Sequence, residues 1–211
     1  MNSSDDLSKE KTESKNVLNN LKSSYILQKL FNNLLRKKSL DIIKYNKKIK
    51  NRININIKDY KEYLEIYSPI EIEIKPANNK YGKFININKE NEIYFHVYFN
   101  NNTEEIKRNY LNENENLEKL KIIIDYQIKS FNGLFAYCRD IEYIYFKKFY
   151  RNNVTNMGSM FRRCTSLKEL NLSSFNTNNV IDMRGMFSEC SEQFRNKIRA
   201  QYKNIKEEAF H

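Results

Sequence analysis

The sequence predicts an α+β fold: a helical head, a small and mainly antiparallel sheet, and a short stack of repeats closed by a C-terminal helix. Three observations lead to this prediction. Apolar residues follow helical spacing over residues 21–67, and apolar and polar residues alternate over much of 68–127. From 128 to 191 the chain then repeats itself with a period of 26 residues.

The head begins after a polar, charged segment, residues 1–20, which predicts a disordered tail. We expect Ser24 to cap a helix that runs to about Leu35. A second helix follows, and a third short helix ends near Ile53. The segment Ile57–Tyr67 keeps its apolar residues in helical register.

Alternation of apolar and polar residues predicts four or five strands after the head. We expect the run at Leu120–Ile124 to pair with the run before it, and to act as a degenerate first repeat that seals the front of the stack. The predicted strands contain Ile70 to Ile74, Phe84 to Ile87, Ile93 to Phe99, Ile106 to Leu111 and Leu120 to Ile124.

The repeat is clearest in three columns of equivalent positions. Cysteine recurs at 138, 164 and 190, phenylalanine recurs at 135, 161 and 187, and a small residue recurs at 133, 159 and 185. Within one copy, Met157 to Cys164 has helical spacing, whereas Leu170 and Leu172 alternate with polar residues as in a strand. One such unit cannot cover its own apolar face, so we expect the units to stack, with their strands in a narrow parallel sheet.

The phrases 170–177 and 179–187 resemble the BspA-like leucine-rich repeat, a 26-residue repeat of surface proteins, over about residues 131–191. The resemblance implies a binding stack without catalytic residues, in a family whose members are often located at the cell surface. The apolar positions expected to form the repeat core are Phe135, Cys138, Ile144, Phe146, Met157, Met160, Phe161, Cys164, Leu167, Leu170, Leu172, Val180, Met183, Met186, Phe187 and Cys190.

Residues 192–211 predict an amphipathic helix that caps the C-terminal end of the stack. Its apolar residues recur at intervals of three and four from Phe194 to Ala209. The three cysteines have two interpretations. A ladder of buried thiols is favoured, because free cysteine is a small buried hydrophobe. A metal site is disfavoured, because ligands 26 residues apart without a nearby histidine do not match known spacings.

The head carries Ile26, Leu27, Leu30 and Phe31 on its first predicted helix and, after a short link, Leu40, Ile42 and Ile43 on its second. This pattern resembles an F-box. The resemblance implies docking to an adaptor of a ubiquitin ligase, with the repeats holding the substrate. A structural helical cap over the neighbouring strands is the alternative. The residues that carry the resemblance, and would dock the adaptor, are Ile26, Leu27, Leu30, Phe31, Leu40 and Ile43.

The net charge of +11 is concentrated in residues 22–61, which contain 12 basic and 2 acidic residues, a balance of +10. This segment is a candidate electrostatic footprint for nucleic acid, anionic lipid or an acidic partner. A solvated helical face is the simpler interpretation.

Catalytic chemistry finds no support in the sequence. The two histidines are His96, in a predicted strand, and His211, and no triad or metal-protease motif is present. We therefore expect no enzyme activity, no catalytic residue, no cofactor and no metal. No apolar run is long enough to span a membrane, and the polar start shows no secretory signal, so a cytoplasmic or nuclear location is expected.

A protein partner of unknown identity is the expected ligand, because tyrosine is enriched at interface hot spots. In the repeat strands, the residues that point away from the core are expected to form the contact surface: Tyr143, Tyr145 and Lys147 on one strand, and Glu169, Asn171 and Ser173 on the next. The sequence thus favours a non-catalytic protein-interaction module. An F-box-type adaptor and a basic nucleic-acid-binding accessory protein are the alternatives.

Overall fold

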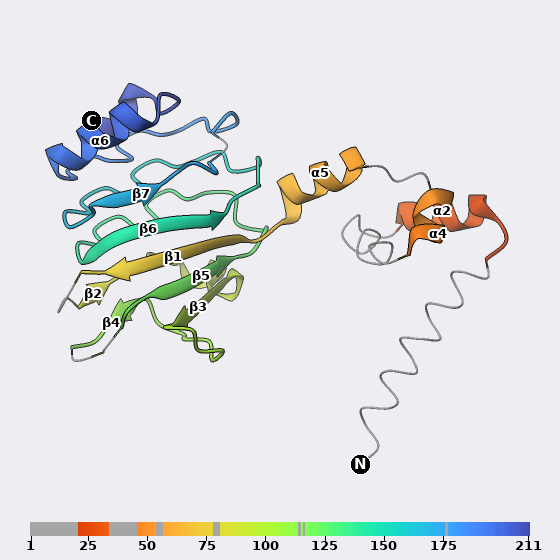
Figure 1. Ribbon diagram of the computed structural model, residues 1–211, viewed down its shortest axis with the longest axis horizontal. Coiled ribbons are helices and arrows are strands. Elements are labelled where there is room, and N and C mark those ends of the chain that lie inside the picture. Colours follow the sequence, from red (N-terminus) through yellow and green to blue (C-terminus); the bar gives the residue numbers. More distant parts are fainter. Residues whose placement is uncertain are drawn as a thin grey trace, which may run out of the picture. The chain divides into compact units, whose positions relative to one another are not determined.

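The computed structural model describes residues 21–33, 46–53, 57–77, 81–113, 115, 117–175 and 177–211 (Figure 1). The chain divides into two compact units, residues 1–64 and residues 65–211. The predicted tail, 1–20, and the second predicted head helix lie outside the described residues.

The first unit contains helices α2 (Ser24–Asn33) and α4 (Lys47–Arg52), and α5 (Ile57–Tyr67) leads into the second unit. The cap of α2 is Ser23, not the predicted Ser24: the Ser23 Oγ accepts the N–H of Ile26 at 3.3 Å. A small core forms here from one residue of α2 and two at α4, because Leu27, Ile49 and Ile53 are almost fully buried.

The second unit is built on a five-stranded mixed sheet. Its strands are β1 (Ile70–Pro76), β3 (Phe95–Phe99), β5 (Leu120–Ile124), β6 (Ile141–Lys148) and β7 (Glu169–Asn171), in the order β3-β5-β1-β6-β7 (Figure 1). A separate two-stranded sheet pairs β2 (Gly82–Lys83) with β4 (Tyr110–Leu111), and a 3-10 helix, η1 (Lys89–Tyr94), precedes β3.

Strand β1 joins the two halves of this unit. It pairs antiparallel with β5 on one side and antiparallel with β6 on the other, whereas β6 and β7 pair in parallel. The predicted front sheet is therefore not a separate layer but part of the same sheet as the repeat strands. The two repeat strands make a single parallel pair, so the described residues do not contain the long parallel sheet of a solenoid.

Three strand predictions were wrong. Strand β5 does not pair with the run before it, because only Tyr110–Leu111 of that run is extended and it pairs with β2. The degenerate first repeat at β5 is also wrong, since β1 occupies the place beside β6. Residues 84–88 form no strand, and Ile93 and Tyr94 belong to η1.

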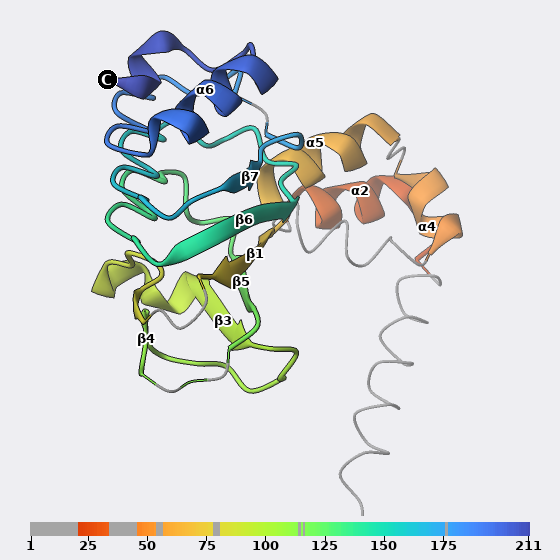
Figure 2. The ribbon, with the colours of Figure 1, turned by 60° about the vertical axis from the view of Figure 1, so that its left-hand side comes forward.

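The repeat appears most clearly in the turns that connect the strands. Backbone N–H groups of one turn donate to carbonyls 25 residues later in the next. Gly133, Phe135 and Tyr137 donate at 2.7–2.9 Å to the turn at 158–162, and Ser159, Phe161 and Arg163 donate at 2.8–2.9 Å to the turn at 184–188. Figure 2 shows these turns beside one another along one side of the sheet.

These turns are not the predicted helical segments. Each contains two residues with positive φ, four positions apart: Gly133 (64°) and Tyr137 (64°), Ser159 (52°) and Arg163 (59°), and Gly185 (61°) and Glu189 (59°). A positive φ breaks the helical hydrogen-bond pattern after each turn, while the apolar side chains still share one face. The column of small residues is explained by its left-handed backbone.

The turns bury a column of aromatic rings. The ring centroids of Phe135 and Phe161 are 5.7 Å apart at an interplanar angle of 5°, and those of Phe161 and Phe187 are 5.6 Å apart at 6°. All sixteen residues expected in the repeat core are buried, with exposed fractions of 5% or less. The 26-residue period therefore places equivalent side chains directly against one another.

The C-terminal segment differs from the predicted single helix. Helix α6 (Glu192–Gln201) starts at Ser191, whose side chain accepts the N–H of Phe194, and it ends at Tyr202; a 3-10 helix, η2 (Glu207–Phe210), follows. This last segment continues the turns. Gly185 N–H donates to Glu208 O at 2.9 Å and Phe187 N–H donates to Ala209 O at 2.7 Å.

Phe210 completes the aromatic column, since its ring lies 5.4 Å from that of Phe187 at 27°. Helix α6 ends before Phe210 because one continuous helix would not bring the Phe210 ring against Phe187. The hydroxyl of Tyr202 meanwhile covers the outer edge of β7: it accepts the N–H of Leu172 at 3.0 Å and donates to Leu170 O at 3.3 Å. The C-terminal segment thus takes the place of a further repeat.

Tyr202→Phe tests this edge closure. Removing the hydroxyl leaves one N–H and one C=O of β7 without their partner, which is expected to lower the free energy of unfolding by about 1–2 kcal/mol. Urea denaturation measures the change. Tyr150→Phe, at a tyrosine that is 54% exposed, is the matched control and is expected to change stability by less than about 0.5 kcal/mol. Equal stability of the two variants would contradict the role given to Tyr202.

Candidate functional site

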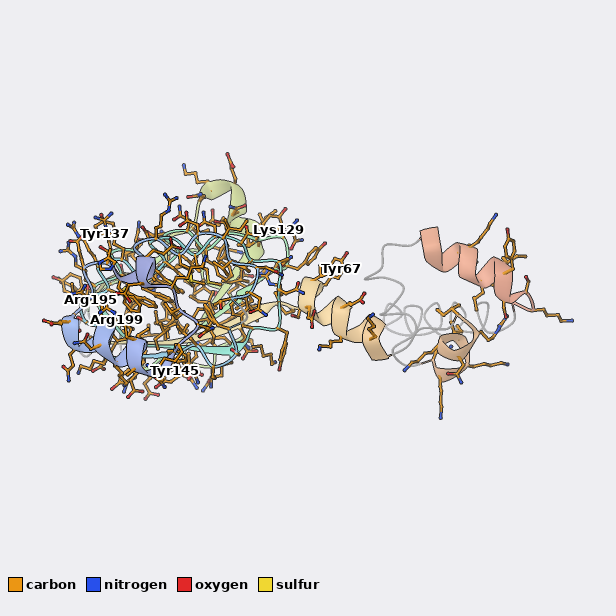
Figure 3. The ribbon with its side chains drawn as sticks, turned by 90° about the horizontal axis from the view of Figure 1, so that it is seen from above. Tyr67, Lys129, Tyr137, Tyr145, Arg195 and Arg199 are labelled. Atoms are coloured by element: carbon orange, nitrogen blue, oxygen red, sulfur yellow. The ribbon has the colours of Figure 1, made fainter. Side chains whose placement is uncertain are left out.

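The candidate site is the outer face of the sheet, the face turned away from the turns. Strand alternation points Ile144 and Phe146 of β6 into the core and leaves Tyr143 and Tyr145 half-buried on the outside. The two tyrosine rings are parallel, with an interplanar angle of 4° and centroids 6.2 Å apart. Figure 3 shows Tyr145 on the side of the unit opposite to Tyr137, which belongs to a turn.

The neighbouring strand β7 fixes one of these tyrosines. The Tyr145 hydroxyl donates to the Glu169 carboxylate at 3.2 Å. Partial burial, followed by this hydrogen bond and the charge of Glu169, raises the pKa of Tyr145 above its usual range. The hydroxyl is therefore neutral at physiological pH. Lys197 of α6 lies 3.9 Å from the other oxygen of Glu169.

The other two predicted residues, Asn171 of β7 and Ser173 just after it, form a local hydrogen-bonded motif. Asn171 lies opposite Tyr145 in the register, and its side-chain oxygen accepts the N–H of Ser173 at 2.9 Å and the Ser173 hydroxyl at 2.6 Å. Both residues are exposed. They rigidify the end of β7, while their outward atoms stay accessible.

Strand β1 contributes the charges of the face. Lys75 lies opposite Tyr143, with its ammonium 5.3 Å from the ring centroid. Glu73 lies opposite Tyr145 and pairs with Lys147 at 3.1 Å. Cross-strand pairs of this kind order the side chains of a sheet face. The tyrosines are thus flanked by charges that already have partners within the chain.

A hollow of about 420 Å³ continues this face toward β3. Its floor includes Tyr98 and Lys121, whose ammonium lies 5.7 Å from the Tyr98 ring centroid. Its rim comes from the loop after β3. The remaining lining residues are Glu73, Asn100, Asn101, Asn102, Thr103, Lys119 and Ile123. The hollow adds amide and hydroxyl groups to a face that otherwise offers aromatic rings and ion pairs.

The residues predicted to dock an adaptor are only partly described. Ile26 and Leu30 of α2 are 50% and 45% exposed, whereas Leu27 is fully buried. Because Leu27 belongs to the core of the first unit, it is not free to contact a partner. The predicted helix with Leu40 and Ile43 and the side chain of Phe31 lie outside the described residues.

His96, the histidine placed in a strand, lies between two carboxylates. Its Nδ1 is 3.2 Å from Glu105 and its Nε2 is 3.6 Å from Asp125. Among the described residues, no group of three or more His, Cys, Asp or Glu side chains could hold a metal ion. The part of the chain that the structure describes also contains no helix long and apolar enough to cross a membrane.

The cysteine column is a ladder of thiols. Cys164 Sγ–H donates to Phe135 O at 3.0 Å, and Cys190 Sγ–H donates to Phe161 O at 3.0 Å. Burial raises the pKa of Cys138 to about 12 and that of Cys190 to about 11, and it raises the pKa of Cys164 well above its usual value. All three are free and buried.

A comparison with protein families matches the repeated part of the chain to one family. A family model described as "Mycoplasma protein of unknown function, DUF285" matches residues 99–209, just over half of the chain. The chain belongs to the DUF285 family. No curated protein and no solved structure matches it.

The DUF285 match contains much of the candidate face. It includes β5, β6 and β7, all three turns, α6 and all of η2 but its last residue, Phe210, and it does not include β1 or the first unit. Lys75 and Glu73, which flank the tyrosines, therefore lie outside the matched residues. In this DUF285 protein the face combines the matched region with a strand that precedes it.

Sequence reasoning found the six outward residues of β6 and β7 but missed their neighbours. The alternation at β1 predicted a strand without indicating that its outer residues would lie beside Tyr143 and Tyr145. The hollow after β3 was also missed, since its loop residues carry no motif. The signal that was present is the charge pattern of β1, Glu71, Glu73 and Lys75, which matches a strand with one solvent-facing side.

The thiol ladder predicts unreactive cysteines. Because the thiolate is the reactive form and burial disfavours it, Cys138, Cys164 and Cys190 are expected to resist the Ellman reagent at pH 8 in the native protein. All three are expected to react promptly in about 6 M guanidinium, which unfolds the chain. Absorbance of the released product measures both rates. Fast reaction of any one thiol in the native state would show that its turn is open to solvent.

Proposed function

We propose that this chain is a non-catalytic protein-interaction module, built on BspA-like leucine-rich repeats, that binds a protein partner on the outer face of its sheet. The single observation that supports this most is the pair of parallel tyrosine rings on β6. Tyrosine and tryptophan supply large contact areas at low conformational cost, and they are enriched in interface hot spots. Tyr143 and Tyr145 are held in place before any partner arrives.

The surroundings of the two rings favour a protein rather than a small metabolite as ligand. The face is open and extends over β1, β6 and β7. Its hollow next to β3 is lined by amides and lysines as well as by Tyr98 and Ile123, and it is not the enclosed, mainly apolar pocket that small ligands usually occupy. The ion pairs around the tyrosines resemble the polar rim that surrounds the core of an interface.

The leucine-rich-repeat part of the proposal rests on the turns. Their backbone hydrogen bonds join residues 25 apart, and their side chains stack in register at a period of 26. Stacked units of this kind are typical of binding scaffolds, because each repeat presents an equivalent outward surface. The family resemblance also suggests a surface location, whereas the sequence favours a cytoplasmic or nuclear one.

The F-box-type adaptor has less support. Of its six docking residues, three have a described side-chain exposure: Leu27 is buried, whereas Ile26 and Leu30 are exposed. A basic nucleic-acid-binding role rests on charge alone. Neither alternative uses the tyrosine pair.

The test of the proposed function is a pull-down from the native cells, followed by a measured affinity for the partner identified. Tyr143→Ala/Tyr145→Ala is expected to weaken that affinity at least about tenfold, since hot-spot truncations cost about 2 kcal/mol or more. Isothermal titration calorimetry measures it, and circular dichroism checks that the fold is retained.

Tyr110→Ala/Tyr150→Ala is the matched control. Both tyrosines are about half exposed and lie in the same unit, outside strands β1, β6 and β7. Affinity is expected to stay within about twofold of the unsubstituted chain, because exposed residues outside an interface contribute little to binding. If the two double variants bind equally well, the partner does not use the outer face and the proposal is wrong.

A further inference from the structure

The first unit exposes a cluster of apolar side chains on helix α2. Tyr25, Ile26 and Leu30 of α2 are 67%, 50% and 45% exposed. They lie within six residues of one helix, whereas Ile93 and Ile181, the other exposed aliphatic residues described, are far from each other in sequence. A helix normally turns such residues toward a core, so a cluster left outside needs an explanation.

The exposed residues share one side of α2. At 100° per residue, Tyr25, Lys29, Ile26 and Leu30 fall within an arc of about 140°. The buried Leu27 lies outside this arc and faces the small core with Ile49 and Ile53. The exposed side of α2 therefore contains both apolar residues and a charged one, since Lys29 lies between Tyr25 and Ile26 around the helix.

Basic residues give helices α2 and α4 a positive charge. Neither α2 nor α4 contains an acidic residue. Lys22, Lys29, Lys47 and Lys48 are exposed, and the Lys29 ammonium lies 5.1 Å from the Tyr25 ring centroid. Arg52, by contrast, is used internally, since it donates to Lys22 O at 3.2 Å and to Ser24 Oγ at 3.4 Å.

We propose that the first unit binds the surface of anionic lipid bilayers, with Tyr25, Ile26 and Leu30 inserted at the interface and the lysines against the headgroups. Apolar residues that alternate with lysines on one helix side are suited to the boundary between acyl chains and headgroups. Lysine stems can extend past an inserted residue toward phosphates. Each lysine near an anionic leaflet adds to the attraction.

Other partners fit the same side less well. Three side chains cannot fill the about 800 Å² per partner that a stable protein interface buries, whereas bilayer binding accumulates from a few inserted residues together with charge. Nucleic acid would use the lysines, but it would leave Ile26 and Leu30 exposed, because phosphate contacts need no aliphatic side chain.

The test uses the full chain and sedimentation of lipid vesicles. Vesicles of equal parts phosphatidylglycerol and phosphatidylcholine are expected to bind at least about tenfold more tightly than vesicles of phosphatidylcholine alone. Raising the salt from about 0.1 to about 0.5 M is expected to weaken this binding severalfold. Equal binding to both kinds of vesicle, or none to either, would overturn the proposal.

Ile26→Ser/Leu30→Ser tests the insertion. It is expected to weaken binding to anionic vesicles about tenfold, because two aliphatic side chains no longer leave water. Its matched control is Ile93→Ser/Ile181→Ser, which removes two even more exposed aliphatic side chains from the second unit and is expected to bind normally. Equal binding by the two double variants contradicts insertion through α2.

Lys47→Gln/Lys48→Gln tests the charge, with Lys89→Gln/Lys129→Gln as the control of equal net charge. The first pair is expected to weaken binding severalfold and the second less than twofold, because the screened attraction is local. Tyr143→Ala/Tyr145→Ala is expected to leave vesicle binding unchanged, which separates this result from the proposed protein-binding function. Binding to RNA or to an adaptor protein that is lost in Ile26→Ser/Leu30→Ser, without vesicle binding, would assign α2 to that partner instead.

Discussion

The hydrogen bonds from each turn to the next are the constraint on which the second unit depends. A turn with two positive-φ residues leaves N–H groups that point along the stack, and buried N–H groups need acceptors. The next turn supplies these acceptors 25 residues later, and this spacing places Phe135, Phe161 and Phe187 in one column. Such a ladder cannot end in solvent without leaving donors and an apolar ring exposed. The tail at Glu208 and Ala209 therefore ends it, and Tyr202 covers the strand edge alongside.

On the other side of the repeat strands, β1, a strand from outside the repeats, lies beside β6 and joins the repeat strands to β5 and β3. Strand β1 runs antiparallel to β6 and is not a copy of the repeat, so its outward residues lie opposite those of β6 without being equivalent to them. This brings Lys75 and Glu73 beside Tyr143 and Tyr145. A further parallel repeat in that place would have brought residues equivalent to those of β7. The composition of the candidate face thus follows from the way in which the stack is closed.

The sequence predicted the parts of this fold that depend on periodicity. All sixteen residues that the 26-residue columns placed in the repeat core are buried, and the alternation at β6 placed the outward tyrosines. It did not predict the features that depend on long-range pairing or on backbone conformation. Tyr137, Arg163 and Glu189 adopt positive φ, although none is a glycine or asparagine. Backbone hydrogen bonds to the next turn hold Tyr137 and Arg163 there, and the Glu189 carboxylate accepts hydrogen bonds from Arg162 and Arg163 of the preceding turn. The end of the C-terminal helix at Tyr202 could not be predicted for a similar reason. The apolar spacing continues past Tyr202, and tertiary contacts decide where the helix ends.

The ion pairs on the outer face bear on the proposed binding of a partner there. Exposed ion pairs contribute little to stability, about 0–1 kcal/mol each, so Lys147 with Glu73 and Lys148 with Glu71 are not needed to hold the sheet together. Their effect is to hold opposite charges in fixed positions around two rigid rings. A partner that buries the rings can leave these ion pairs at the rim of the interface, where they stay hydrated. A partner that places an unpaired charge next to the member of a pair with the same sign is repelled. The tyrosines are therefore suited to provide affinity, and the paired charges from β1 and β6 are suited to select among partners.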